Sequence, residues 1–171
     1  MLQLNTMAFS PVDTIIDFLE PVANLLFFND DKTYNKKQLG SYINVYTKNF
    51  PDVEAADLII VGCAETRGAG VSVHDNTGMD AVRSHFYQLF QWHTEVAIAD
   101  IGNIKPGASF PDPSSDLHPV LGELSALNKK VVILGGTHDL MLAQYNVFVA
   151  EQKIIEATCV DALLDMNAES C

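Results

Sequence analysis

Apolar positions follow two different patterns along this chain of 171 residues. From residue 57 onward, short continuous apolar runs are followed by segments with apolar residues at helical spacing. A continuous run predicts a strand that is buried on both faces, and helical spacing predicts an amphipathic helix. The predicted strands are 57–63, 95–101, 131–135 and 154–161, and the predicted helices between them are 77–92, 116–127 and 140–151. This order predicts right-handed crossovers and a parallel sheet.

The first 56 residues show helical spacing only. Their apolar positions predict one helix over 11–27, with a kink at Pro21, and a second helix over 35–49. We therefore expect residues 1–56 to form an N-terminal helical extension ahead of an α/β domain over 57–171. No helix follows the last predicted strand, so an edge or face of the sheet would be open. We expect the chain to be cut short after its fourth strand, or to be covered there by a partner chain.

The helical segments also predict which side chains face the sheet. In 116–127, the expected inward residues are Leu117, Val120, Leu121 and Leu124. In 77–92, they are Met79, Val82, Phe86, Leu89 and Phe90.

Composition and charge exclude several classes of function. Lys and Arg total 10, Asp and Glu total 22, and the net charge of −12 disfavours binding to nucleic acid or to an anionic membrane. The longest apolar stretch, 15–28, contains two acidic residues and does not predict a membrane span. Three widely spaced cysteines indicate neither a disulfide framework nor a zinc site, which favours a reducing, cytoplasmic setting.

One strand end carries the sharpest chemical signal. Residues 131–134 are apolar and run directly into Gly135-Gly136-Thr137-His138-Asp139. Two glycines allow a tight turn, and the helical pattern that follows places His138 at a helix N-terminus facing the sheet crevice. Ligands of open α/β sheets bind at the carboxyl ends of strands. His138 is therefore a candidate ligand, with a simple helix-capping role as the alternative.

A second strand end supplies two carboxylates. Asp161 and Asp165 follow the predicted strand over 154–161. They can converge with His138 only if the two strands are neighbours. Imidazole and carboxylate groups suit a divalent cation, so these three residues predict half of a metal shell. The alternative is that Asp161 caps a turn and Asp165 is solvated.

These motifs, in this order, resemble those of the ureohydrolase family of arginase, agmatinase and formimidoylglutamase. The Gly-Gly-Thr-His-Asp run resembles the family's Gly-Gly-Asp-His-Ser, and Asp-Ala-Leu-Leu-Asp over 161–165 resembles its Asp-Ala-His-x-Asp. The helix start over 76–83, with Arg83, and the segment Asp100-Ile101-Gly102-Asn103 add to the likeness. It covers about residues 57–166, the N-terminal part of the family's sequence. Formimidoylglutamase is the closest in character, through the turn over 63–65 and residues 100–103.

The resemblance implies a three-layer α/β/α fold and a binuclear manganese hydrolase that cleaves a C–N bond in a guanidino or formimino compound, such as formimidoylglutamate. It implies His138, Asp161 and Asp165 as manganese ligands. Members of the family commonly form trimers or hexamers, so we expect a homo-oligomer with a small-molecule substrate. From its loop position, Arg67 is a candidate to hold a substrate carboxylate, with an ordinary solvated loop as the alternative.

Two departures narrow this expectation. Leu163 stands where the family has a second histidine, and no later Asp-x-Asp motif follows residue 165. The chain therefore holds only part of the family's metal centre, and we expect it to bind one manganese ion at most. Two hypotheses follow: a metal-dependent hydrolase whose activity belongs to a longer protein, or a non-catalytic, degenerate relative that acts as an interaction or regulatory subunit.

Overall fold

The computed structural model describes residues 14–23, 34–66, 77–105, 117–138, 140–158 and 160. Its elements, in chain order, are η1 (Ile16–Phe18), β1 (Leu19–Glu20), η3 (Leu39–Ser41), β2 (Asn44–Val45), β3 (Leu58–Gly62), α2 (Thr77–Phe86), β4 (Ile98–Ile104), α3 (Leu117–Ala126), β5 (Lys130–Leu134) and α4 (Leu140–Ala150).

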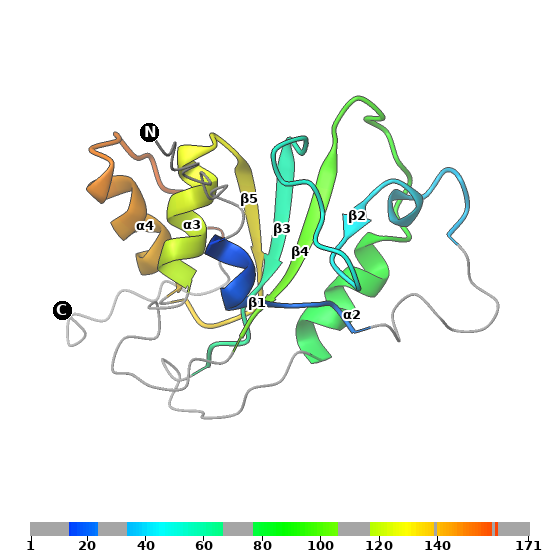
Figure 1. Cartoon of the computed structure of the whole chain (residues 1–171), viewed down its shortest axis with the longest axis horizontal. Helices are drawn as coiled ribbons and strands as arrows, with labels where there is room; N and C mark the ends of the chain where they lie inside the picture. The colour runs from blue at the N-terminus through cyan, green and yellow to red at the C-terminus, as the bar shows by residue number, and fades with distance from the viewer. Residues whose placement is uncertain are drawn as a thin grey trace, which may run out of the picture.

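The strands of the described residues form one sheet with the order β1-β4-β3-β5 (Figure 1). β3 lies at its centre and pairs in parallel with both β4 and β5. The short strand β2 also pairs in parallel with β4, whereas β1 pairs with it in antiparallel orientation. The predicted parallel sheet is confirmed.

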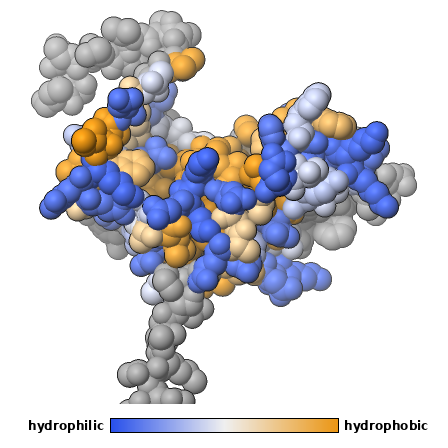
Figure 2. All heavy atoms as spheres, turned by 90° about the horizontal axis from the view of Figure 1, so that it is seen from above, coloured by the Kyte–Doolittle hydropathy of each residue, from blue (hydrophilic) through white to orange (hydrophobic). Residues whose placement is uncertain are grey.

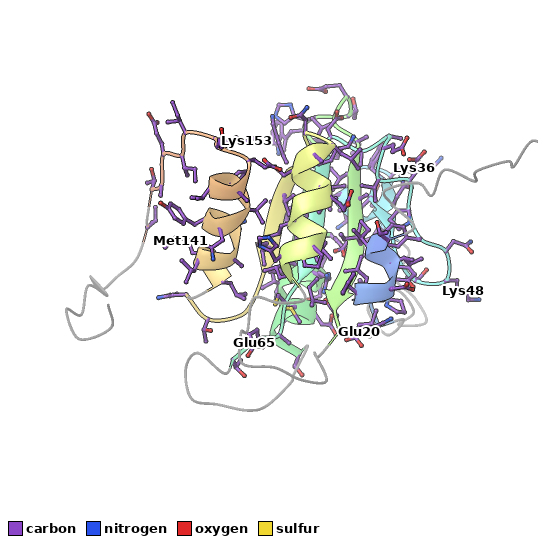
Figure 3. The ribbon with its side chains drawn as sticks, turned by 60° about the vertical axis from the view of Figure 1, so that its left-hand side comes forward. Glu20, Lys36, Lys48, Glu65, Met141 and Lys153 are labelled. Atoms are coloured by element: carbon purple, nitrogen blue, oxygen red, sulfur yellow. The ribbon has the colours of Figure 1, made fainter. Side chains whose placement is uncertain are left out.

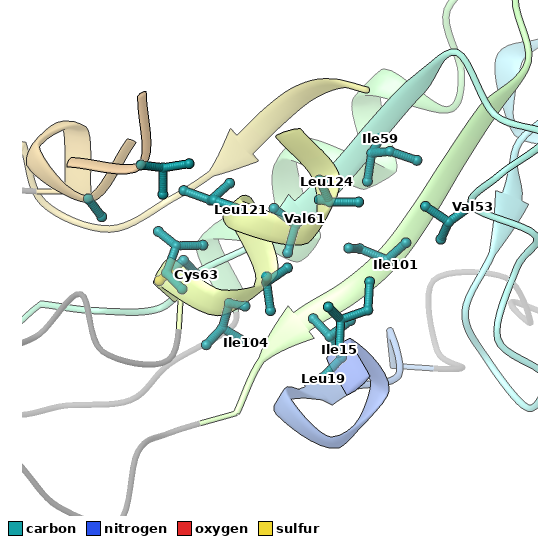
Figure 4. Packing of buried hydrophobic residues seen from close by; sticks show 14 of the residues in the cluster. Ile15, Leu19, Val53, Ile59, Val61, Cys63, Ile101, Ile104, Leu121 and Leu124 are labelled. Atoms are coloured by element: carbon teal, nitrogen blue, oxygen red, sulfur yellow. The ribbon is translucent and has the colours of Figure 1, made fainter. Parts of the chain in front are cut away.

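Helices cover both faces of this sheet. α3 and α4 lie on one face and α2 on the other, which gives three layers (Figure 1). Side chains alternate between the faces along each strand. Ile59 and Val61 of β3 join a core with α3 and α4, and Ile60 joins a smaller core with Tyr87. Figure 4 shows the larger core, where Leu121 and Leu124 of α3 lie over β3 and β4.

The predicted elements after residue 57 largely match the structure. The helix predicted over 77–92 ends as α2 at Phe86, and the second strand runs over 98–104 where 95–101 was expected. The prediction of a strand over 154–161 is wrong for its described residues, 154–158 and 160, which form no strand. Ile154 is 99% exposed, and these residues pair with none of the described strands.

The two N-terminal helix predictions fail over most of their described residues. In the first, residues 14–15 are α-helical and 16–18 form a 3₁₀ turn, but β1 follows directly and pairs with β4. Residues 39–41 form a second such turn before β2. The apolar residues of the first segment do not form one face of a long helix. Instead, Ile15 and Leu19 pack in the larger core beside β4. Tertiary contact with the sheet thus outweighed the local helical pattern.

No helix among the described residues is long and apolar enough to cross a membrane.

Leu124 offers a test of the three-layer core. Its side chain is fully buried between α3 and the sheet. We expect Leu124→Ala to lower the free energy of unfolding by about 2–5 kcal/mol, because it leaves a cavity. Leu89→Ala makes the same change at a side chain that is 54% exposed, and should cost less than about 0.5 kcal/mol. Urea unfolding followed by circular dichroism measures both, and equal losses would contradict the packing described here.

Candidate functional site

The carboxyl ends of β3, β4 and β5 meet at one edge of the sheet, because the three strands are parallel (Figure 1). This is the edge at which open α/β sheets bind ligands. The described segments that follow the strands there are 63–66 after β3 and 135–138 after β5. Glu65 of the first segment and Met141 at the start of α4 are labelled in Figure 3.

The turn after β5 depends on its two glycines. Gly135 and Gly136 have φ angles of +85° and +81°, in the left-handed region that favours glycine. A Cβ atom on Gly135 would lie 2.8 Å from Cγ of Met79, and one on Gly136 would overlap the side chain of Leu140. A side chain at either position would be strained by the positive φ and would crowd Met79 or Leu140, so the glycine pair sets where the chain enters α4.

Backbone hydrogen bonds join this turn to the loop after β3. The amide of Cys63 donates to the carbonyl of Leu134 at 2.9 Å, and the amide of Thr137 donates to the carbonyl of Glu65 at 3.1 Å. The two loops are therefore held side by side at the carboxyl edge. This contact places the beginning of α4 beside the end of the central strand.

His138 lies at the beginning of α4, as predicted, and is exposed. The carbonyl of His138 accepts a hydrogen bond from the amide of Met141 at 3.1 Å, so it belongs to the first helical turn. Its side chain lines a hollow between α4 and residues 155–158, together with Met141 and Tyr145. The hollow is largely apolar, with Glu156 as its carboxylate.

The other predicted site residues, Asp161, Asp165 and Arg67, lie outside the described residues, as does Leu163. Within the described ranges, no three His, Cys, Asp or Glu side chains come close enough to hold a metal ion. The described residues by themselves therefore do not build a metal site. The predicted set of three ligands stays a prediction, of which the structure places His138 alone.

A buried ion pair lies beneath the same edge. Arg83 of α2 and Asp100 of β4 are both fully buried. Nε of Arg83 donates to Oδ2 of Asp100 at 2.8 Å, and Nη2 donates to Oδ1 at 3.0 Å. This two-pronged geometry is the strongest form of guanidinium–carboxylate contact.

Further hydrogen bonds complete the network around this pair. The hydroxyl of Tyr87 donates to Oδ2 of Asp100 at 2.7 Å, and the amide of Gly102 donates to Oδ1 at 3.0 Å. Arg83 also donates to Oδ1 of Asn103 at 2.7 Å and to the carbonyl of Gly102 at 3.0 Å. The carboxylate thus accepts four hydrogen bonds, which is close to its full capacity.

The charges of the network agree with this geometry. Burial acts to lower the pKa of Arg83, but its hydrogen bonds to Asp100 and the charge of that carboxylate outweigh burial and raise the pKa. Burial, together with the negative charge of Asp100, raises the pKa of Tyr87 well above its usual value. Tyr87 therefore stays a neutral donor and Arg83 a permanent cation.

The hydrophobic pattern of residues 77–92 did not predict this network of buried polar side chains. The predicted inward residues Val82, Leu89 and Phe90 are each about half exposed, and the inward stripe consists of Met79, Arg83 and Tyr87. The stripe does have helical spacing, at every fourth residue, but it contains a charge. The sequence did contain one indication of these residues. Arg83 and Asp100 each lie in a segment, 76–83 and 100–103, that resembles the ureohydrolase family.

Comparison with known proteins finds structural likeness without sequence matches. The sequence matches no family profile, and no curated protein matches it. An arginase superfamily protein from Trypanosoma cruzi superposes with a TM-score of 0.55 and 16% identity, over 68% of this chain and 41% of that one. A formiminoglutamase variant from the same organism, solved with Mn²⁺, superposes with a TM-score of 0.54 and 17% identity, over the same shares.

The chain therefore has an arginase-like fold. It spans about two fifths of the length of each of these solved structures. The predicted fold class is confirmed.

The buried ion pair can be tested by removing its members singly and together. Arg83→Met leaves the carboxylate of Asp100 buried without a counter-charge, so we expect a loss of about 3–5 kcal/mol in the free energy of unfolding. Arg83→Met/Asp100→Leu removes both charges and should recover part of that loss. Urea unfolding measures each variant.

The matched control is Glu95→Gln, which breaks the exposed pair between Glu95 and His93. We expect its unfolding midpoint to equal that of the unmodified chain. Additive losses in the double variant would show that Arg83 and Asp100 are not coupled.

Proposed function

We propose that this arginase-like chain is part of a manganese-dependent hydrolase that cleaves a C–N bond in a guanidino or formimino compound, with formimidoylglutamate as the leading substrate. The observation that carries the proposal is the turn after β5. Its two left-handed glycines place His138 at the beginning of α4, on the carboxyl edge of an arginase-like sheet. One of the solved structures with this fold is a formiminoglutamase variant with Mn²⁺, which supports the choice of metal.

In this proposal His138, Asp161 and Asp165 hold manganese, and Arg67 orients the substrate. A bound manganese ion would lower the pKa of a coordinated water and orient it for attack on the substrate carbon. The chain's own contribution is positional, since the glycine turn and the contact between Thr137 and Glu65 hold the loop that carries His138. Leu163 offers no ligand atom, so we propose one ion at most in this chain, with the full activity belonging to a longer protein.

We propose a cytoplasmic setting and a small-molecule substrate, with neither nucleic acid nor membrane as a partner. The net charge of −12 supports the exclusion of polyanionic partners. The three cysteines are widely spaced and indicate no disulfide framework, which supports a reducing compartment.

The second candidate is a non-catalytic, degenerate relative that serves as an interaction or regulatory subunit. Leu163, in place of the family's histidine, favours it. Metal binding separates the candidates, because a hydrolase of this kind needs the metal and an interaction subunit does not.

Manganese titration tests the proposed ligand. We expect the chain to bind one Mn²⁺ weakly, and His138→Ala to abolish binding, because it removes the sole imidazole of the proposed set. His118→Ala is the matched control, since His118 is also exposed in the first turn of a helix, and binding should persist. Loss of the free Mn²⁺ electron paramagnetic resonance signal reports binding. Binding that survives His138→Ala would refute the site, and no binding at all would favour the interaction subunit.

Leu163→His tests the alignment of the second aspartate motif. The new imidazole should raise the affinity for manganese, measured by the same titration, because it returns a nitrogen ligand between Asp161 and Asp165. Leu163→Gln, which adds polarity without an imidazole, is the control. Equal affinities in these two variants would argue against placing residue 163 in the metal shell.

A further inference from the structure

Two short pieces of the chain cover the outer edge of β4, which is the edge that faces away from β3. β2 pairs in parallel with Ala99 and Asp100, and β1 pairs with Asn103 and Ile104 in antiparallel orientation (Figure 1). Each piece contributes two residues to the sheet. The surface on the side of β2, at the right in Figure 2, is mainly hydrophilic. The outer edge of β4 is therefore closed by the chain itself.

Residues 14–23, here called the edge segment, are attached by more than the two strand residues of β1. The amide of Lys105 donates to the carbonyl of Phe18 at 2.9 Å, just beyond the end of β4. The amide of Val22 donates to the carbonyl of Tyr46 at 2.9 Å, next to β2. The edge segment thus follows β4 from its carboxyl end as far as β2.

Aliphatic side chains hold the edge segment against the body of the domain. Ile15 and Leu19 are each 1% exposed, and they pack in the larger core, which also contains Ile101 and Ile104 of β4 (Figure 4). Val22 is 2% exposed. Apolar side chains gain free energy in proportion to the area that they remove from water. The edge segment is therefore bound through its side chains as well as through its backbone.

Gly102 of β4 permits this close contact. Its φ angle is +86°, and a Cβ atom on it would overlap the carbonyl oxygen of Glu20 and lie 3.2 Å from Cδ1 of Tyr46. A side chain here would be strained by the positive φ and would crowd the edge segment. The amide and the carbonyl of Gly102 also bind Asp100 and Arg83 of the buried network. The glycine thus serves the network and the contact with the edge segment together.

The edge segment and β4 differ in how readily each would pair with a further strand. β4 is seven residues long and buried at every position. β1 has two residues, and Pro21, which follows it, has no N–H group to donate. Asp17, on the other side of β1, is exposed. Short edge strands, prolines and charges are the means by which proteins protect a sheet edge from other chains. The edge segment therefore replaces a long, apolar edge with a short, protected one.

We infer that residues 14–23 act as an edge guard. They occupy in cis the strand-accepting edge of β4, and so keep this edge from pairing with other chains. The occupant that fits the edge is an extended segment with aliphatic side chains at the spacing of Ile15, Leu19 and Val22. A tethered segment acts at an effective concentration on the order of millimolar, which excludes a free peptide at micromolar concentration. The inference is independent of the proposed hydrolase activity, because the guard contains none of the proposed metal ligands.

Fluorescence anisotropy of a labelled peptide with the sequence of residues 14–23 tests the guard. Leu19→Ala in the full chain weakens the attached segment, because it removes a buried aliphatic side chain. We expect the peptide to bind this variant at least about tenfold more tightly than it binds the unmodified chain. Leu124→Ala is the matched control, since it makes the same change at an equally buried residue of α3. It should bind the peptide no more tightly than the unmodified chain does.

Hydrogen exchange shows where the peptide binds. In the Leu19→Ala chain, saturating peptide should slow exchange of the Lys105 amide, which is the donor to the carbonyl of Phe18, and leave the amides of β5 unchanged. A peptide that carries Leu19→Asp should not bind. Val22→Ala replaces Leu19→Ala if circular dichroism shows that the latter is unfolded. Equal binding to the guard variant and to Leu124→Ala would overturn the inference, and so would binding that leaves Lys105 unprotected.

Discussion

The buried ion pair between Arg83 and Asp100 is the constraint on which the candidate edge of the sheet depends. A charge in the interior is tolerated only when its partner and its hydrogen bonds are complete. Here the carboxylate accepts from Arg83, Tyr87 and the amide of Gly102, so its hydrogen bonds are complete with α2 docked on β4 in the observed position. The same guanidinium binds Asn103, which ties the end of β4 to the helix layer.

The docking of α2 on β4 also affects the carboxyl edge of the sheet. Met79 lies one turn before Arg83 on the same stripe of α2, and it packs where a side chain on Gly135 would otherwise stand. The helix that carries the ion pair thus also bounds the glycine turn that leads to His138. The buried ion pair and the glycine turn are therefore linked through the same helix, α2.

Prediction from sequence succeeded where one local pattern was sufficient. The run that became β3 is apolar because both faces of the sheet are covered there, and the inward residues of α3 were identified correctly because they pack on that sheet. Prediction failed where a contact with another part of the folded chain determines the secondary structure. Ile15 and Leu19 have helical spacing, yet β1 forms because β4 offers an edge. Ile154 belongs to a strand-forming run, yet residues 154–158 form no strand and pair with none of the described strands.

The sequence by itself determined the α/β order, the parallel sheet and the glycine pair that places His138 at the start of α4. Each follows from the covalent chain, through apolar runs and the freedom of glycine at positive φ. Only the tertiary structure decided that an arginine belongs to the inward stripe of α2. The stripe is chosen by the carboxylate of Asp100 on the facing strand, and a contact across 17 residues leaves no trace in hydrophobic periodicity. A buried charge is favourable only opposite its partner, and that partner is visible only once the chain is folded.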